Sequence, residues 1–368
     1  MPYQSPTFKK AANPVAFSAG TWYNNNNKNP GKITETSRGE NMKHKPLPIG
    51  VEDFKRLVDN GYYFVDKTLM IKELLENKET VNLFTRPRRF GKTLNMSMLQ
   101  RFFEATEKSN AYLFDGLKIA AYPEYMAYQG QYPVISVSLK SMKQASYTDA
   151  FYMYKNLIAK EYEKHKIILE SNQILDSEKE VFQNVYLNSI RTLSDILAKY
   201  YEKNVIILID EYDVPLENAY HEGFYDDMTN LIRSCFESAL KTNPSLEFAV
   251  LTGCLRVSRE SIFTGLNNLK TYSITKNKFS QYFGFTQEEM QEILQNFSLE
   301  QYAETIAKWY DGYRFGLTEI YNPWSVLNCI DSYLQNDMVA CEPYWSNTSS
   351  NRIVKRLIEE SNERTKSM

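Results

Sequence analysis

The chain has little cysteine, almost no net charge and no long apolar run. Its 4 cysteines form no CxxC pair and have no histidine nearby, which excludes the common zinc spacings and a disulfide framework. A formal net charge of −2 argues against a protein built chiefly to coat nucleic acid. No stretch approaches the ~20 apolar residues that span a bilayer, and the N-terminus lacks the apolar centre of a signal peptide. These absences predict a cytoplasmic chain without a membrane partner.

What the sequence does contain is enough apolar material for two packed domains. The chain has 368 residues, of which 43% are hydrophobic. Residues 1–42 hold a run of asparagines, several prolines and glycines, and no periodicity. We therefore expect a disordered leader there, because such a segment cannot bury enough apolar surface to fold.

Four short apolar runs predict the strands of a sheet. They are continuous rather than alternating, as expected of strands that are buried on both faces of a parallel sheet. Amphipathic stretches of helical period separate them, including a helix that begins at Lys92. Strands that alternate with helices indicate an α/β fold with a parallel sheet flanked by helices. The four runs are 81–84, 133–139, 205–209 and 248–251.

The same patterns suggest domain limits. The α/β core is expected at 43–275, with a helical insertion at about 145–204 that contains two long helices, roughly 147–168 and 178–201. From 276 to 368 the pattern becomes mainly helical and predicts a small accessory domain. Two of its helices are expected to begin after Thr286 and Asn322, whose side chains are preferred at helix N-caps.

A basic loop lies between the first apolar run and the helix that begins at Lys92. It consists of Arg86, Pro87, Arg88, Arg89, Phe90, Gly91, Lys92 and Thr93. Strand, loop and helix in this order are the context of a phosphate-binding loop of the pattern G-x-x-x-x-G-K-[ST], with Arg86 at the position of the first glycine. Gly91 would let the backbone approach a phosphate, Lys92 would reach the β- and γ-oxygens of ATP, and the Thr93 hydroxyl would ligate Mg²⁺. The alternative is a surface loop of solvated arginines.

Two acids follow the apolar run that ends at Ile209. Asp210, at the carboxyl edge of the strand, would hold Mg²⁺, and Glu211 would polarise an attacking water. The alternative is a strand followed by an acidic turn. After the next strand, Thr252 would sense the γ-phosphate, and Arg256 would neutralise transition-state charge in the same or a neighbouring subunit. An arginine in a loop can equally be solvated or form a structural ion pair.

With these motifs the sequence resembles the AAA-ATPase-like proteins of bacteria. The resemblance covers about Lys45 to Ser350 and rests on ordered segments at 63–68, 86–93, 209–213, 251–253 with Arg256, 261–268, 282–285, 309–313 and 321–324. In such families Arg86 followed by Pro87 is the normal form of the loop. The resemblance also implies that the strand of Thr252 lies between the two strands that carry the other motifs.

Members of that family often carry a C-terminal domain similar to PD-(D/E)xK nucleases. That motif needs an acid on one strand and a (D/E)-x-K on the next, and no such strand pair is recognisable in this sequence. The chain stops at Met368, about where such a domain would begin. We therefore expect either a truncated reading frame or a lost second domain.

The leading hypothesis is an ATPase that binds Mg²⁺ and ATP and uses hydrolysis to drive a conformational change. One alternative is a nucleotide-binding switch with negligible turnover, if the neutralising arginine comes only from a partner. Another is a phosphotransferase, in which Asp210 or Glu211 activates a hydroxyl of a bound substrate. ATP is the expected ligand, a homo-oligomer or partner protein is a further expectation, and nucleic acid is suggested by family analogy alone.

Overall fold

The computed structural model describes residues 44–183, 189–254, 262–263, 265–337 and 340–344. The leader expected at 1–42 lies outside these residues. From His44 on, the chain forms one compact unit. None of the helices in these ranges is long and apolar enough to cross a bilayer. The 4 cysteines are free thiols.

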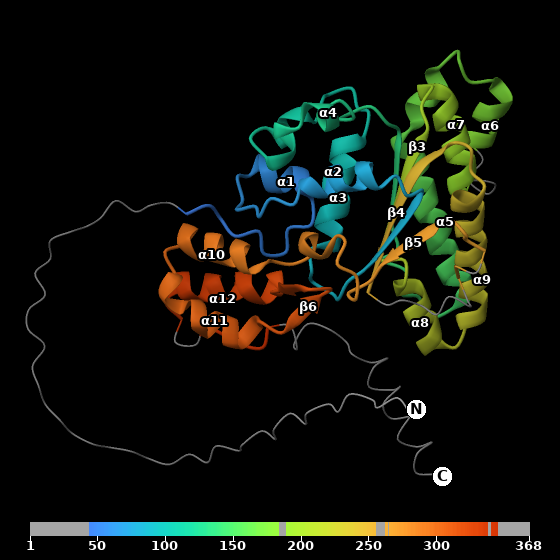
Figure 1. The fold of residues 1–368 in the computed structure, drawn as a ribbon. Coiled ribbons are helices and arrows are strands. Elements are labelled where there is room, and N and C mark those ends of the chain that lie inside the picture. The colour runs from blue at the N-terminus through green and yellow to red at the C-terminus, as the bar shows by residue number, and fades with distance from the viewer. Residues whose placement is uncertain (1–43, 184–188, 255–261, 264, 338–339, 345–368) are drawn as a thin grey trace, which may run out of the picture. The chain divides into compact units, whose positions relative to one another are not determined.

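A five-stranded parallel sheet forms the centre of the fold (Figure 1). Its strand order is β2-β3-β4-β1-β5. All four predicted strands are confirmed, and the position of β4 between β1 and β3 matches the order that the family resemblance implied. The sequence did not predict β5, a four-residue edge strand that is only partly apolar. The strands are β1 (Val81–Thr85), β2 (Val134–Ser138), β3 (Val205–Asp210), β4 (Leu246–Gly253) and β5 (Leu269–Tyr272).

Helices cover both faces of this sheet because successive strand residues point to opposite sides. In β3, Ile206 and Leu208 join one core cluster, whereas Val205, Ile207 and Ile209 join the other. One face carries α1 (Phe54–Asp59), α2 (Leu69–Asn77), α3 (Lys92–Phe103) and α4 (Pro123–Met126) (Figure 1). The other carries α5 (Tyr147–Lys164), α6 (Asp176–Gln183), α7 (Ile190–Tyr201), α8 (Val214–Glu222) and α9 (Tyr225–Phe236).

The helical insertion differs in detail from its prediction. The helix expected at about 178–201 is present as two, α6 and α7, with residues 184–188 between them outside the described ranges. Short 3₁₀ turns complete this half of the chain at Ala111–Phe114, Lys118–Ala121 and Lys166–Glu170, and a π-turn at Glu237–Lys241 extends α9.

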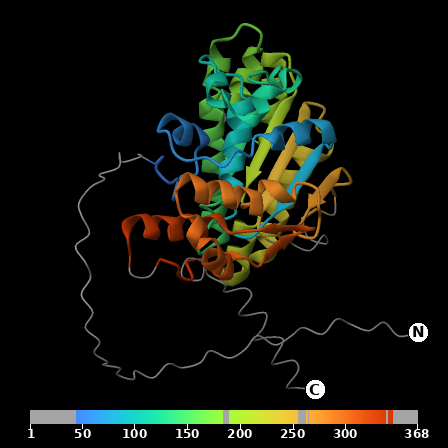
Figure 2. The same ribbon diagram turned by 60° about the vertical axis from the view of Figure 1, so that its left-hand side comes forward.

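The C-terminal part is mainly helical, as expected, but it also contains a small antiparallel hairpin. Its helices are α10 (Gln287–Asn296), α11 (Ala303–Tyr310) and α12 (Pro323–Gln335), with 3₁₀ turns at Ser280–Tyr282 and Glu300–Tyr302. The hairpin consists of β6 (Tyr313–Phe315) and β7 (Thr318–Ile320). The predicted N-caps are confirmed: Thr286 forms a capping box, and the Asn322 side chain accepts from the backbone of Ser325. The three helices form one group in both views (Figure 1 and Figure 2).

Packing between the α/β core and the C-terminal part is continuous across residue 275. Phe279, Phe283 and Phe315 belong to the same core cluster as Phe84 of β1. A third cluster contains α10, α11 and α12, and apolar side chains from residues 47–65 pack against it. The C-terminal part thus packs against the sheet through Phe279, Phe283 and Phe315, and against the start of the described chain through its three helices.

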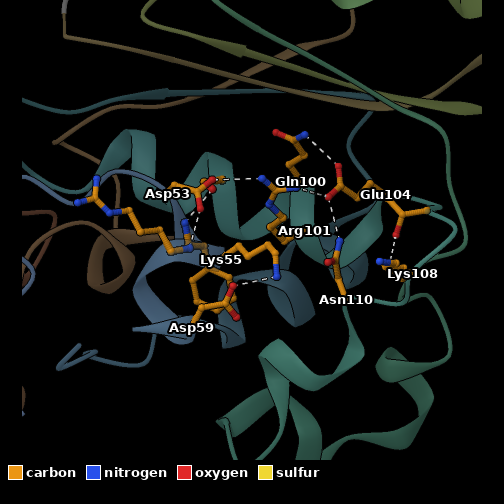
Figure 3. A network of polar contacts seen from close by, with 12 residues as sticks. Asp53, Lys55, Asp59, Gln100, Arg101, Glu104, Lys108 and Asn110 are labelled. Atoms are coloured by element: carbon orange, nitrogen blue, oxygen red, sulfur yellow. Dashed lines mark hydrogen bonds and ion pairs between the residues drawn. The ribbon is translucent and has the colours of Figure 1, made fainter. Parts of the chain in front are cut away.

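A polar network fixes the segment before α1 relative to α3 (Figure 3). Asp53 caps α1 by accepting from the backbone of Arg56 at 2.7 Å, and its other oxygen accepts from Arg101 of α3 at 3.2 Å. Arg101 also donates to Glu104 at 2.8 Å, and Asn110 donates to the same oxygen of Glu104 at 2.9 Å. This network holds the preceding residues in place beside the helix that begins at the basic loop.

A buried ion pair joins the first part of the core to α10. Lys67 is 7% exposed, and its Nζ lies 2.6 and 2.5 Å from the two carboxylate oxygens of Glu289. The same Nζ donates to the carbonyl of Gln281 at 2.6 Å. Glu289 in turn accepts from the backbone of Thr286, so the ion pair and the cap of α10 share one carboxylate.

Replacing Lys67 with Met should destabilise the fold strongly, because it leaves the Glu289 carboxylate buried without its cation. The expected loss in the free energy of unfolding is about 3 kcal/mol, as is usual when one partner of a buried pair is removed. Urea denaturation followed by circular dichroism measures it. Lys72→Met is the matched control: its pair with Glu76 lies on the surface and should contribute little. Equal losses in the two variants would contradict the importance of the buried pair.

Candidate functional site

The basic loop connects the end of β1 to the start of α3 and turns sharply at two positions. Gly91 is the N-cap of α3 with a φ of 78°, and Arg89 has a φ of 70°, which is uncommon for a residue with a side chain. Left-handed residues in such a loop can direct successive N–H groups into one concavity, and the α3 N-terminus adds its own free N–H groups and positive dipole. The backbone is therefore shaped for an anion.

Lys92, the first residue of α3, folds back over the loop. Its side chain is 4% exposed, and its Nζ donates to the carbonyls of Arg86 at 3.2 Å and Pro87 at 3.0 Å. The same ammonium lies 3.3 Å from the Cys254 sulfur at the tip of β4. The predicted lysine thus lies within its own loop, where phosphate oxygens could replace the two carbonyls.

The carboxylate of Asp210 at the end of β3 joins three elements. It accepts from the Thr93 hydroxyl of α3 at 2.8 Å through one oxygen and from the Thr252 hydroxyl of β4 through the other. Asp210 is 5% exposed, so these hydroxyls supply the partners that a buried carboxylate needs. A hydroxyl and a carboxylate at this spacing are hard oxygen ligands of the kind that Mg²⁺ prefers. The Thr252 hydroxyl, which was expected to sense a γ-phosphate, donates to Asp210 in this structure and can orient that carboxylate.

Glu211 follows Asp210 in an unusual backbone conformation. Its φ is 53°, a left-handed value that turns the chain out of β3 and places Glu211 in the wall of a cavity. Burial raises the pKa of its carboxyl above the ordinary value, and the nearby Lys92 acts in the opposite direction. Strain and a perturbed acid at one residue are typical of functional sites.

The cavity has a volume of about 460 Å³, within the range of small-molecule sites. Arg88 to Thr93 and Glu211 form one part of its wall. Other lining residues are more apolar and come from segments that sequence reasoning did not assign to a site: 48–52, Phe285, Trp324 and Leu327. Lys140 and Lys143, which follow β2, also line it.

Two of these additional residues belong to sequence segments that were recognised but had no predicted function. Phe285 and Trp324 lie within two of the segments that carry the family resemblance, 282–285 and 321–324. Periodicity could not place them beside a loop some 200 positions earlier, because only the packing of the C-terminal part brings them there.

The loop side chains divide between the cavity and the surrounding structure. Arg88 forms an ion pair with Glu217 of α8 at 2.5 Å, and the Arg89 guanidinium stacks 3.8 Å from the centre of the Trp324 ring. Phe90 is buried with its ring against Tyr313 and Phe315. The side chain of Arg86 is also buried, and neither Arg86 nor Pro87 lines the cavity. Arg256, the expected neutralising arginine, lies outside the described residues.

Three features together define a P-loop NTPase-like fold. They are a parallel sheet with β4 between β1 and β3, a Gly-Lys-Thr loop between β1 and α3, and an aspartate at the end of β3. The chain belongs to the family described as Predicted AAA-ATPase, whose model matches residues 48–263.

A relative from Azotobacter chroococcum mcd 1, described as "Uncharacterized protein in vnfD 5'region", is 27% identical over 323 residues. The aligned residues are 87% of this chain and 57% of the relative, so the chain spans little more than half the length of that protein.

Replacing Glu211 with Gln should stabilise the fold at neutral pH. Burial raises the pKa of this carboxyl above its value in the unfolded chain. The protonated carboxyl of Glu211 therefore destabilises the fold least, and this form is present at low pH. As the pH rises through the folded pKa, the buried carboxyl ionises and the fold loses stability. The melting temperature of Glu211→Gln should exceed that of the wild type by more at pH 8 than at pH 5.

Glu288 in the first turn of α10 provides a control of opposite sign. Backbone hydrogen bonding lowers the pKa of its carboxyl, so its ionised form favours the fold at neutral pH and this contribution is lost on acidification. Glu288→Gln should thus lower the melting temperature at pH 8 and less so at acid pH. The same response in both variants would contradict the burial argument for Glu211.

Proposed function

We propose that this chain binds Mg²⁺ and ATP at the loop formed by residues 86–93 and hydrolyses the nucleotide. The observation that carries the proposal is the contact of Thr93 and Thr252 with the two oxygens of Asp210, next to Lys92. This arrangement would bring phosphate and Mg²⁺ together at the carboxyl edge of a parallel sheet, where such sheets bind their ligands.

The residues present fit the expected ligand group by group. The Lys92 ammonium would leave the loop carbonyls for the β- and γ-phosphate oxygens. Thr93 and Asp210 would hold Mg²⁺, which when bound offsets the negative charge of the phosphates. The more apolar wall with Phe285 and Leu327 suits a planar base.

Glu211 is the proposed general base. It lines the cavity beside the loop, and burial raises the pKa of its carboxyl toward the pH at which a base works best. Its carboxylate would orient the attacking water and accept its proton. Asp210 is engaged by two hydroxyl donors, which suits it to the metal and leaves the proton transfer to its neighbour.

A nucleotide-binding switch with little turnover is the second candidate. The observation that favours it is that Arg88 and Arg89 both have partners in the structure, Glu217 and Trp324. If these contacts persist with nucleotide bound, transition-state charge must be neutralised by Arg256 or by another chain. Single-turnover hydrolysis compared with nucleotide affinity separates the two candidates, and a specific activity that rises with protein concentration would indicate an arginine supplied by a partner.

Lys92→Ala should weaken the binding of Mg-ATP by about 10- to 100-fold, the scale of one lost charge-assisted hydrogen bond. Mg-ATP should raise the melting temperature of the wild type and hardly that of the variant. Lys308→Ala, on the exposed side of α11, is the control and should bind normally. If neither ATP nor GTP shifts the melting of the wild type at millimolar concentration, the proposed function is wrong.

Glu211→Gln and Asp210→Asn should affect different steps. Glu211→Gln should retain Mg-ATP and slow single-turnover hydrolysis by roughly 10²-fold, a typical contribution of a general base. Asp210→Asn should instead weaken the Mg²⁺-dependent part of ATP binding, measured by titration with and without the metal. The reverse pattern would show that the two acids have exchanged roles.

A further inference from the structure

The first position of the phosphate loop carries a large charged side chain that does not face the cavity. Arg86 is 0% exposed and stands where the general pattern of such loops has glycine. Its Nη1 donates to the carbonyls of Thr85 at 2.9 Å and Tyr272 at 2.6 Å, and its Nη2 donates to the carbonyl of Phe279 at 3.3 Å. Within the described ranges no carboxylate forms an ion pair with it, and burial lowers its pKa to about 10.

Two aromatic rings also contact this guanidinium. Its central carbon lies 4.9 Å from the centre of the Phe283 ring and 5.0 Å from that of Phe315. Cation–π contact and hydrogen bonds to carbonyls together offset the cost of removing the charge from water. The side chain does not line the cavity, so the structure that surrounds it holds the charge in this costly position.

The hydrogen bonds of Arg86 fix the position of the loop relative to the neighbouring strands. Its backbone N–H donates to the carbonyl of Gly253 in β4 at 3.0 Å, while its side chain reaches Tyr272 at the end of β5. Arg86 therefore bridges the two strands on either side of β1, at the point where β1 ends. Its own carbonyl accepts from Lys92, so the position of Arg86 also determines where that ammonium rests.

Except for Thr85 beside it, the side-chain contacts of Arg86 lie beyond residue 263, where the family match ends. They are Tyr272, Phe279, Phe283 and Phe315. The stacking of Arg89 on Trp324 makes a second contact between the loop and this region. The edge strand β5 and the C-terminal part together thus supply the side-chain contacts that support the loop.

We propose that Arg86 is a positioning residue of the nucleotide site: its buried guanidinium ties the start of the phosphate loop to the carbonyls of Tyr272 at the end of β5 and Phe279 after it, and so holds the loop backbone, with its N–H groups, in the shape that binds phosphate. The inference rests on the proposed function, since it concerns the same site. It predicts that arginine, and not the glycine of the general pattern, is required at this position.

The test is to restore the glycine. Arg86→Gly recreates G-x-x-x-x-G-K-T, yet it should weaken binding of Mg²⁺ with a non-hydrolysable ATP analogue by about 10- to 100-fold, the range seen when a group that orients a binding residue is removed. Calorimetric titration well below the melting temperature of each variant measures the affinity. Arg86→Lys keeps a buried cation but loses the forked geometry, so it should bind with an intermediate loss.

A control separates loss of positioning from loss of stability. Ser146→Ala removes the N-cap of α5, whose hydroxyl bonds Asp149 in the same helix, and should lower the melting temperature while leaving affinity unchanged. If folded Arg86→Gly binds like the wild type, the inference is overturned. If Arg86→Gly does not fold, wild-type affinity in Arg86→Lys overturns it instead.

Labelling of the wild type with an arginine-specific dicarbonyl reagent provides a readout that needs no variant. Arg86 should resist modification with and without nucleotide, whereas a phosphate ligand would react freely and be protected by nucleotide. That protection pattern at Arg86 would overturn the inference. Failure of the wild type to bind nucleotide would instead refute the proposed function, so the two failures are distinguishable.

Discussion

The site depends on the buried carboxylate of Asp210. A carboxylate removed from water is stable only where donors replace its hydration, and here the hydroxyls of Thr93 and Thr252 do so. Those donors come from the start of α3 and the end of β4, so one charge holds two neighbouring strands and the loop helix at a common point. The left-handed turn at Glu211 directly after it then directs the next side chain into the cavity.

The C-terminal part takes part in the site and is not an appendage to it. Trp324 and Phe285 line the cavity, Glu289 pairs with Lys67, and the carbonyl of Phe279 accepts from the Arg86 side chain. These contacts are buried and polar or aromatic, which makes them specific in geometry and costly to break. A shift of the loop would move Arg89 and, through their contact, Trp324 at the start of α12, which is the kind of connection that the proposed nucleotide-driven change would need.

Much of the fold could be predicted from the sequence because its signals are local. The apolar runs of β1 to β4, the caps at Thr286 and Asn322, and the Gly-Lys-Thr turn each depend on residues within a few positions of one another. The edge strand β5 was missed because it is short and only partly apolar and its pairing partner, β1, is distant in sequence. The hairpin of β6 and β7 was missed because each of its strands is very short and only partly apolar. The division of the expected helix at about 178–201 into α6 and α7 was missed as well, since helical period continues on both sides of the break.

For the site, the sequence by itself determined which residue types could meet a nucleotide: a lysine and a threonine after a glycine, and two acids after a buried strand. Only the tertiary structure decided where each side chain points. It turned Arg86 away from the cavity, set Thr252 against Asp210, and brought Phe285 and Trp324 into the cavity wall. The reason is that a side chain's direction depends on donors, acceptors and rings contributed by distant segments, 42 positions away for Thr252 and Asp210 and 193 for Arg86 and Phe279, and no local pattern records them.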